Sequence, residues 1–313
     1  MSIFNIKQSL IASALLLLLG SAAQASTLWV NCGGKGGLNS IGVALKLLQS
    51  TLAFGPNAIN VSGACHENVV IQSIDRLTLT AVKGASINDT SGGNLVTVTI
   101  DDSRDVTING FTINGGAGGA DALDCQDGSL CRLSGNTIQG AVNGYGVGVF
   151  FSQVFLNGGT LQNNNTGLGA INGASAKATN VIIQDNSANG IEIRGQSLVN
   201  ATTTITANAA AGVFVHESGA LNCQGCQITG NGGIGLIVRR DSSARLFGAY
   251  AVTGNTGGGV LLTEESSAYF QSVGTVTGNT GGLDVFCGSS FTTAKFATTN
   301  IGGGTTNCVE PSP

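Results

Sequence analysis

The sequence predicts an all-β protein built as a parallel β-helix, a solenoid in which each turn of the chain stacks on the one before it. Three observations favour this fold class. A short motif that ends in Asn recurs at steps of 22 to 24 residues over the second half of the chain. Each Asn is followed by Gly and a run of alternating apolar residues, as in a half-buried strand. Glycine accounts for 49 of the 313 residues and proline for only three, which fits many tight turns.

The recurring Asn lies at positions 186, 208, 231, 255 and 279, and earlier copies of the motif place Asn136 and Asn164 in the same column. A unit of this length holds three short strands and tight turns, with no room for a helix. We expect each Asn to occupy a turn of left-handed backbone, and the stacked side chains to bond one another and the adjacent backbone. The step from Asn136 to Asn164 is 28 residues, which predicts an inserted loop. A leucine-rich repeat has a similar length, but its Leu pattern is absent.

Residues 1–25 have the pattern of a secretory signal peptide. Lys7 precedes the apolar run Leu15–Leu19, and Ala23-Gln24-Ala25 is a small-residue cleavage motif. The apolar run is too short for a membrane anchor, and no later segment is long enough. We therefore expect a secreted or periplasmic protein without a membrane span.

The remaining chain divides into three segments. Residues 26–57 form an N-terminal cap with a short helix near residues 40–50, residues 58–305 form the β-helix, and residues 306–313 form a C-terminal tail. The helix places Ile41, Leu45 and Leu48 on one face, with Ser40 as its N-cap, so that it covers the open end of the core. We expect His66 and Glu67, at the start of the β-helix, to have structural roles.

All eight cysteines follow the signal peptide, and an even number in an exported chain predicts disulfides. Closeness in the sequence favours four short loops, although eight cysteines allow many other pairings. The expected pairs are Cys32–Cys65, Cys125–Cys131, Cys223–Cys226 and Cys287–Cys308. The short spacing from Cys223 to Cys226 also suits a redox pair, but a structural disulfide in a turn fits the context better.

Several segments resemble bacterial secreted proteins of the pectate-lyase-like superfamily. They are Ile59-Asn-Val-Ser-Gly-Ala-Cys-His-Glu-Asn-Val-Val-Ile, then Leu77-Thr-Leu, and the later rungs with Gly-Asn-Thr-Ile-Gln. The resemblance covers nearly all of the chain after the signal peptide. It implies a right-handed parallel β-helix of roughly 10–11 rungs with a short N-terminal capping helix. Activity does not follow, because this superfamily includes lyases, hydrolases, esterases, epimerases, adhesins and tailspikes.

The catalytic motifs of the related enzymes are missing from the sequence. The only Asp-Asp pair, Asp101-Asp102, lacks the companion motifs found in polygalacturonases. Pectate and pectin lyases carry a proline-containing Arg element and a Trp-rich loop, but this chain has Pro only at 56, 311 and 313 and one Trp at 29. The motifs of pectin methylesterases are also absent, so no catalytic residue is carried over.

One charged column stands out within the repeat. The residues four positions after the repeated Gly are Arg194, His216 and Arg239, followed by Thr263. Because side chains alternate along a strand, these residues face outward if the apolar residues beside them face inward. Stacking of parallel strands then places their backbones about 5 Å apart, each to the next. We expect the three side chains to lie on one exposed sheet face.

The column has two interpretations. It is a binding track for an acidic polysaccharide, because guanidinium groups suit carboxylates, and His216 flanked by two Arg residues suits a base. Alternatively it is a solvated face whose charges pair with Glu192, Glu217 and Asp241. We expect Glu192 and Glu217 to take part in the candidate site in either case.

A second candidate is an acidic cluster that holds six of the 17 acidic residues: Asp101, Asp102, Asp105, Asp121, Asp124 and Asp127. Carboxylates suit Ca²⁺, but their spacing matches no known calcium loop, so we expect no cofactor, with Ca²⁺ as the alternative. The aromatic residues Tyr145, Phe150, Phe151 and Phe155 form either a platform for sugar stacking or a hydrophobic cluster.

The net charge of −4 and the lack of a basic run argue against nucleic acid as a partner. We therefore expect a secreted, monomeric, non-catalytic β-helix protein, a recognition or surface-interaction rod with acidic polysaccharide as its candidate ligand. The alternative is a polysaccharide lyase or epimerase that acts on uronate-containing glycans. The sequence leaves open whether the protein is an enzyme.

Overall fold

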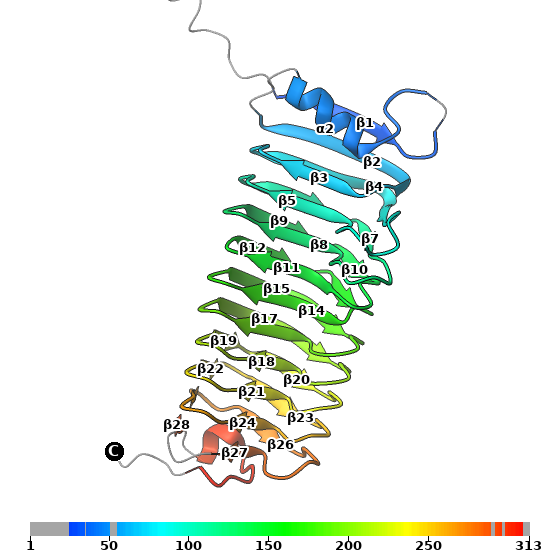
Figure 1. Ribbon diagram of the computed structural model, residues 1–313. Coiled ribbons are helices and arrows are strands. Elements are labelled where there is room, and N and C mark those ends of the chain that lie inside the picture. The colour runs from blue at the N-terminus through cyan, green and yellow to red at the C-terminus, as the bar shows by residue number, and fades with distance from the viewer. Residues whose placement is uncertain (1–24, 35, 51–54, 289–291, 296–297, 309–313) are drawn as a thin grey trace, which may run out of the picture.

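The computed structural model describes residues 25–34, 36–50, 55–288, 292–295 and 298–308. The chain winds into a rod of stacked rungs, with one α-helix at the N-terminal end (Figure 1). Every strand pairing of the described residues is parallel. The predicted signal peptide lies outside the described residues apart from Ala25. No helix among the described residues is long and apolar enough to cross a membrane.

The strands form two sheets. The smaller sheet has ten strands, one per rung: β3 (Val69–Gln72), β5 (Val98–Asp101), β8 (Leu123–Gln126), β11 (Tyr145–Phe150), β14 (Thr166–Ile171), β16 (Ile191–Arg194), β18 (Val213–Val215), β21 (Leu236–Val238), β24 (Val260–Leu262) and β27 (Val285–Cys287). Its ten strands agree with the predicted number of rungs.

The larger sheet has 18 strands. Most rungs contribute two of them, which a bend separates. They are β1 (Thr27–Asn31), β2 (Asn57–His66), β4 (Leu77–Asn88), β6 (Val106–Asn109), β7 (Thr112–Asn114), β9 (Leu130–Ser134), β10 (Thr137–Gln139), β12 (Gln153–Asn157), β13 (Thr160–Gln162), β15 (Ser175–Gln184), β17 (Leu198–Thr206), β19 (Ala220–Gln224), β20 (Gln227–Thr229), β22 (Ser243–Phe247), β23 (Ala251–Thr253), β25 (Ser267–Phe270), β26 (Thr275–Thr277) and β28 (Thr293–Lys295). Within the segment assigned to the cap, β1 already pairs with β2.

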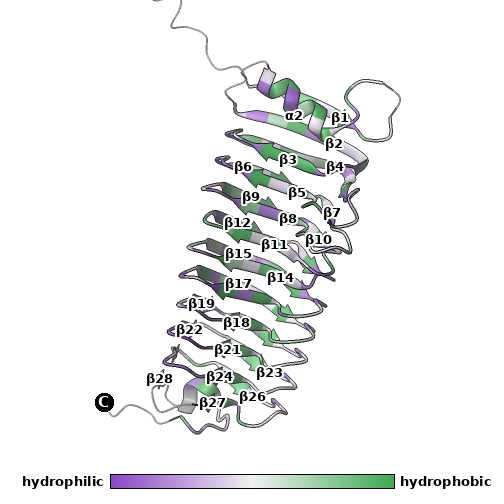
Figure 2. Cartoon of the chain, in the orientation of Figure 1, coloured by the Kyte–Doolittle hydropathy of each residue, from purple (hydrophilic) through white to green (hydrophobic). Residues whose placement is uncertain are grey.

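The core runs along the axis of the rod, and apolar residues recur in every rung (Figure 2). In β16, Ile191 and Ile193 are buried, whereas Glu192 and Arg194 alternate with them on the outer face. Register carries this pattern to the next rung, where Val213 and Val215 lie beside the two Ile residues. Alternation along each strand and register between strands therefore fix which face of every strand meets solvent.

The repeated Asn residues form a buried amide ladder. The side-chain nitrogen of Asn186 donates to the side-chain oxygen of Asn208 at 2.8 Å, and Asn208 donates to Asn231 at 2.9 Å. The same oxygen atoms accept the backbone N–H of the previous Asn. The expected bonding is confirmed, but the expected left-handed backbone is wrong. The positive φ angles are found at the residues before each Asn, such as Asp185 and Ala207. The turn therefore requires Asn for the hydrogen bonds of its side-chain amide and not for its backbone conformation.

Asn136 does not belong to this column. Asn136 lies at the bend between β9 and β10, and the residue in the same place one rung later is Gly159. Asn164 lies at a different bend, after β13. The residue that corresponds to Asn164 is Ala141, whose N–H donates to the side-chain oxygen of Asn164. The step of 28 residues therefore joins two different bends, and the inserted loop inferred from it is wrong.

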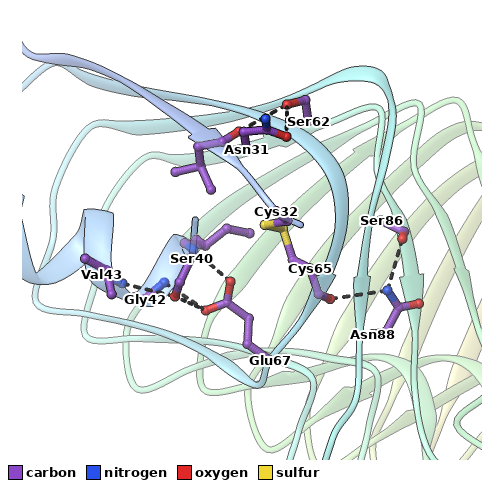
Figure 3. Close-up of a disulfide and its surroundings, with 12 residues drawn as sticks. Asn31, Cys32, Ser40, Gly42, Val43, Ser62, Cys65, Glu67, Ser86 and Asn88 are labelled. Atoms are coloured by element: carbon purple, nitrogen blue, oxygen red, sulfur yellow. Dashed lines mark hydrogen bonds between the residues drawn. A yellow bond between two sulfur atoms is a disulfide. The ribbon is translucent and has the colours of Figure 1, made fainter. Parts of the chain in front are cut away.

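The helix α2 (Ile41–Ser50) covers the N-terminal end of the core and buries Ile41, Leu45 and Leu48, as expected. Ser40 accepts the N–H of Val43 at 3.3 Å, which confirms its N-cap role. Glu67 adds a second cap: its carboxylate accepts the N–H groups of Ile41 and Gly42 at 2.7 and 3.0 Å (Figure 3). A carboxylate at this helix end is stabilised by the helix dipole.

The eight cysteines are joined in the four predicted pairs. Cys32–Cys65 fastens the segment after β1 to the end of β2, beside α2 (Figure 3). Cys287–Cys308 ties the last described residue to β27, near the 3-10 helix η1 (Thr298–Ile301). The two ends of the rod, where a solenoid core would otherwise be open, are thus cross-linked.

Candidate functional site

The outward face of the smaller sheet carries the charged column. The N–H of His216 donates to the carbonyl of Ile193 at 2.9 Å, and the N–H of Arg239 donates to the carbonyl of Val215 at 3.0 Å. Arg194 is the last residue of β16, and His216 and Arg239 come directly after β18 and β21, so the three residues lie on successive rungs. The neighbouring outward column holds Glu192 and Phe214 in register.

His216 is more enclosed than expected. Its side chain is only 8% exposed and its ring stacks on Phe214, with the ring centroids 4.2 Å apart. Nε2 lies 3.1 Å from Glu192 and Nδ1 lies 3.5 Å from Glu217. The expectation of three exposed side chains is therefore wrong for His216, because an aromatic ring covers it and two carboxylates lie beside it.

Glu192 connects the column to a tyrosine. The hydroxyl of Tyr145 donates to Oε2 of Glu192 at 3.0 Å, and Oε1 of the same carboxylate faces His216. Nε of Arg194 lies 3.5 Å from Oε1. Burial and the negative charge of Glu192 raise the pKa of Tyr145, so the phenol keeps its proton at neutral pH.

Two glycines allow Tyr145 to reach Glu192. Gly148 and Gly169 occupy the outward column between Asp124 and Glu192, in register with both. A Cβ atom at Gly169 would lie 2.7 Å from the ring of Tyr145. The phenol therefore covers β14 at a position without a side chain, and its hydroxyl meets the next rung.

On the other side of Gly148 lies a pair of carboxyl groups. A Cβ at Gly148 would lie 2.5 Å from Asp121 and 2.6 Å from Asp124. Asp121 accepts the N–H of Tyr145 at 2.7 Å. Burial, followed by the hydrogen bond and charge of Asp121, raises the pKa of Asp124 to about 9. The pair therefore retains a proton at neutral pH.

The two guanidinium groups of the column have unused donors. Arg239 lies over Phe214, 4.7 Å from the ring centroid, and forms no ion pair within 4.0 Å with any carboxylate that the structure describes. Nε of Arg194 and Nε of Arg239 are buried without a hydrogen-bond partner among the described residues. The Arg194 side chain is 39% exposed. The exposed part of a guanidinium suits an anionic ligand.

The family described as "Right handed beta helix region" matches residues 96–256 and 155–301, more than half of the chain. The chain belongs to the right-handed β-helix family. Among solved structures, this β-helix protein is similar to the A-module of mannuronan C-5 epimerase AlgE4 from Azotobacter vinelandii. The TM-score is 0.55 and the sequence identity 13%, over 85% of this chain and 94% of that chain. At this identity the similarity shows a shared fold. No curated protein matches the chain in sequence.

The predicted acidic cluster of this β-helix protein does not converge on one point. Among the described residues, the one group of three with metal-like spacing is Cys32, Cys65 and Glu67, outside this cluster. Its two sulfur atoms are joined in a disulfide. Asp121 and Asp124 instead form the pair beside Tyr145, and the expectation of no cofactor, with Ca²⁺ as the alternative, stays a prediction.

The sequence placed Arg194, His216 and Arg239 together but missed the role of Tyr145. Tyr145 was grouped with aromatic residues, and it does contact Phe150 at an edge, with ring centroids 6.5 Å apart. Phe155 lies instead on β12 of the larger sheet. A usable signal is present in β11 and β14: Gly148 and Gly169 replace side chains at outward positions, so a neighbouring side chain can lie across them.

Taken together, these side chains form a chain of polar contacts beside a cation. The phenol of Tyr145 donates to the carboxylate of Glu192, the imidazole of His216 lies on its other side, and the guanidinium of Arg194 lies 3.5 Å from the same carboxylate. Such a chain can accept a proton at the phenol oxygen while the phenolic proton moves to the carboxylate.

Proposed function

We propose that this β-helix protein binds a uronate-containing polysaccharide across β14, β16 and β18 and catalyses proton transfer at the carbon next to the sugar carboxylate. This is the chemistry of a polysaccharide lyase or epimerase. The observation that carries the proposal is the chain from Tyr145 through Glu192 to His216 beside Arg194. The structural neighbour is a mannuronan epimerase, which supports a polysaccharide as the substrate.

Removal of a proton next to a carboxylate moves charge onto the carboxylate, where a cation stabilises it. In the proposed reaction Arg194 binds the sugar carboxylate. The C–H bond breaks, its proton joins the oxygen of Tyr145, and the phenolic proton moves to Glu192. The remaining electron pair either expels the glycosidic oxygen, which takes a proton from water, or accepts a proton on the opposite face. The first outcome is a lyase reaction and the second an epimerase reaction.

The residues around this site can contact further sugar units of the polymer. Arg239 offers a second guanidinium one rung beyond His216, and Phe214 and Ile237 give an apolar strip beside it. Leu261 and Phe286 continue the strip into a cavity of about 430 Å³. Alternating charged and apolar surface is typical of sites that hold an acidic sugar by its carboxylate and its ring.

One observation favours a second candidate function, a non-catalytic recognition rod. Both nitrogens of His216 already face carboxylates, and Glu217 also pairs with Arg240 at 3.3 Å. In that case the network only positions Arg194 and Arg239 for binding. Both candidate functions predict that the protein binds the polymer, but only the first predicts turnover.

Four disulfides suit an oxidising compartment. We propose that the protein works outside the cytoplasm, in the periplasm or beyond the cell, after removal of residues 1–25. We propose that it acts as a monomer.

The experiment is to incubate the oxidised protein with polygalacturonate, polymannuronate and polyguluronate, with neutral dextran as control. Absorbance of unsaturated sugars reports a lyase, and proton NMR of the sugar ring reports an epimerase. The proposal expects one of these signals with a uronate polymer. Binding without either signal on any uronate polymer would favour the recognition rod, and absence of binding would contradict both.

A further inference from the structure

A second ordered column lies on the larger sheet, on the strand that follows the smaller sheet in each rung. Arg132, Phe155 and Lys177 stack in register on β9, β12 and β15. Further along the rod, Arg245, Tyr269 and Lys295 stack in the same way on β22, β25 and β28. We call these six residues the basic–aromatic ladder.

Two amide side chains join the halves of the ladder. Asn200 is in register with Lys177, and Asn222 is in register with both Asn200 and Arg245. The amide of Asn222 donates to Asn200 at 3.0 Å. The column is therefore continuous from β9 to β28, and its order is cation, aromatic, cation, two amides, then cation, aromatic, cation.

The strands that carry the ladder contain no acidic residue. None of the strands of the larger sheet from β9 to β28 contains Asp or Glu, although the whole chain has a net charge of −4. Arg132 pairs with Asp105 at 2.5 Å, from the bend before β6. Lys177, Arg245 and Lys295 form no ion pair within 4.0 Å among the residues that the structure describes.

The aromatic members are available for contact. Phe155 is 37% exposed and Tyr269 is 44% exposed, so each presents part of a ring to solvent. A shallow cavity of about 700 Å³ lies over the second half of the ladder, and Asn222, Arg245, Tyr269 and Lys295 contribute to its lining.

We propose that the basic–aromatic ladder is a second binding surface, which holds an extended acidic polysaccharide along the axis of the rod. Cations bind sugar carboxylates or sulfates, exposed rings pack on the apolar faces of sugars, and amides bond hydroxyl groups. The rungs repeat about every 4.8 Å, close to the length of one pyranose unit in an extended chain. Two cations with an aromatic ring between them therefore match charged groups on alternate sugars.

The ladder shares no residue with the site on the smaller sheet, so it is tested in a background that lacks that site. The parent for this experiment carries Arg194→Ala and Arg239→Ala. Binding of polygalacturonate is measured by isothermal titration calorimetry at low salt, before and after adding Lys177→Ala, Arg245→Ala and Lys295→Ala. The matched control instead adds Lys46→Ala, Lys83→Ala and Arg104→Ala, which removes the same charge from exposed positions elsewhere.

The background protein should bind polygalacturonate, and the ladder substitutions should weaken that binding about tenfold or more, because three charge-assisted contacts are lost. The control substitutions should weaken it less than about twofold, since they change only the long-range field. Circular dichroism checks that both variants keep the fold. Loss of all binding in the background, equal weakening by the control, or tighter binding of single-stranded DNA than of polygalacturonate would each overturn the proposal.

Discussion

The hydroxyl of Tyr145 on β11 bonds Glu192 on β16, two rungs further along the rod, at 3.0 Å. Because β14 lies between these strands, the phenol must cross one whole rung. Gly169 makes the crossing possible, since it leaves the outward position under the ring empty. The candidate site therefore joins residues that are far apart in the sequence and do not lie on adjacent rungs.

Gly169→Ala tests this crossing. The new methyl group would lie 2.7 Å from the ring of Tyr145, so the ring must move and the hydrogen bond to Glu192 is lost. We expect turnover of the uronate polymer to fall about a hundredfold. The free energy of unfolding should decrease by only about 1–3 kcal/mol. Gly119→Ala is the control, because nothing lies within 4 Å of its added methyl group. Parental turnover in Gly169→Ala would show that the contact is incidental.

Arg194→Ala combined with Arg239→Ala tests ligand binding by the charged column. Each guanidinium is expected to contribute about 1–2 kcal/mol through charge-assisted contacts, so the pair should weaken binding of a short oligouronate by about 2–4 kcal/mol. A short ligand is used because it cannot span both sheets. Lys83→Ala with Arg104→Ala removes the same charge elsewhere and should have little effect. Equal affinity of the double variant and the parent would reject the column as a binding site.

Asp124→Asn tests the protonated carboxyl pair. The pKa of Asp124 rises from 3.8 to about 9 on folding, chiefly through burial. A raised folded-state pKa gives stability that is full below about pH 4 and is lost as the pH rises toward about 9. The free energy of unfolding of the parent, measured with urea, should therefore fall between neutral and alkaline pH. Asp124→Asn should flatten that fall, whereas Asp185→Asn at an exposed position should not. Identical slopes for the parent and Asp124→Asn would contradict the assignment.

Asn208→Ala tests the amide ladder. Asn208 donates to Asn231 and accepts from both the backbone and the side chain of Asn186, entirely out of solvent. Its removal leaves buried donors unsatisfied in the neighbouring rungs, so we expect a loss of about 2–4 kcal/mol in urea unfolding. Asn143→Ala removes an exposed amide with one hydrogen bond and should cost less than about 1 kcal/mol. Equal costs for the two variants would mean that the ladder adds no stability.

Much of the fold follows from the sequence because a solenoid repeats one local geometry. The alternation of apolar and polar residues correctly predicted that Ile191 and Ile193 point into the core. The constant spacing after the repeated Gly correctly predicted that Arg194 and His216 lie on adjacent rungs. Cysteines close in the sequence are paired because each loop spans no more than about one rung or one bend. The repeat also led to one wrong assignment. The sequence around Asn136 matches the motif, but Asn136 lies at a different bend of the rung.

Much of the candidate site does not follow from the sequence, for two physical reasons. Long side chains act across rungs, so Tyr145 reaches Glu192 through a gap that only the coordinates of Gly169 reveal. Burial depends on neighbours as well as on the direction of a strand. His216 points outward, yet Phe214 and two carboxylates enclose it.

The central claim is that Tyr145 transfers a proton from the substrate, and Tyr145→Phe tests it most directly. The protein is incubated with each uronate polymer in deuterated water, and deuterium uptake is followed by mass spectrometry together with absorbance of unsaturated sugars. The parent should give one of the two signals, and Tyr145→Phe should slow it by about 10²–10⁴-fold with unchanged binding, because only the hydroxyl is lost. The control Tyr250→Phe, which removes a buried phenolic hydroxyl outside both proposed surfaces, should keep the parental rate. A Tyr145→Phe variant as fast as the parent, or a parent that binds every polymer without either signal, would contradict the account.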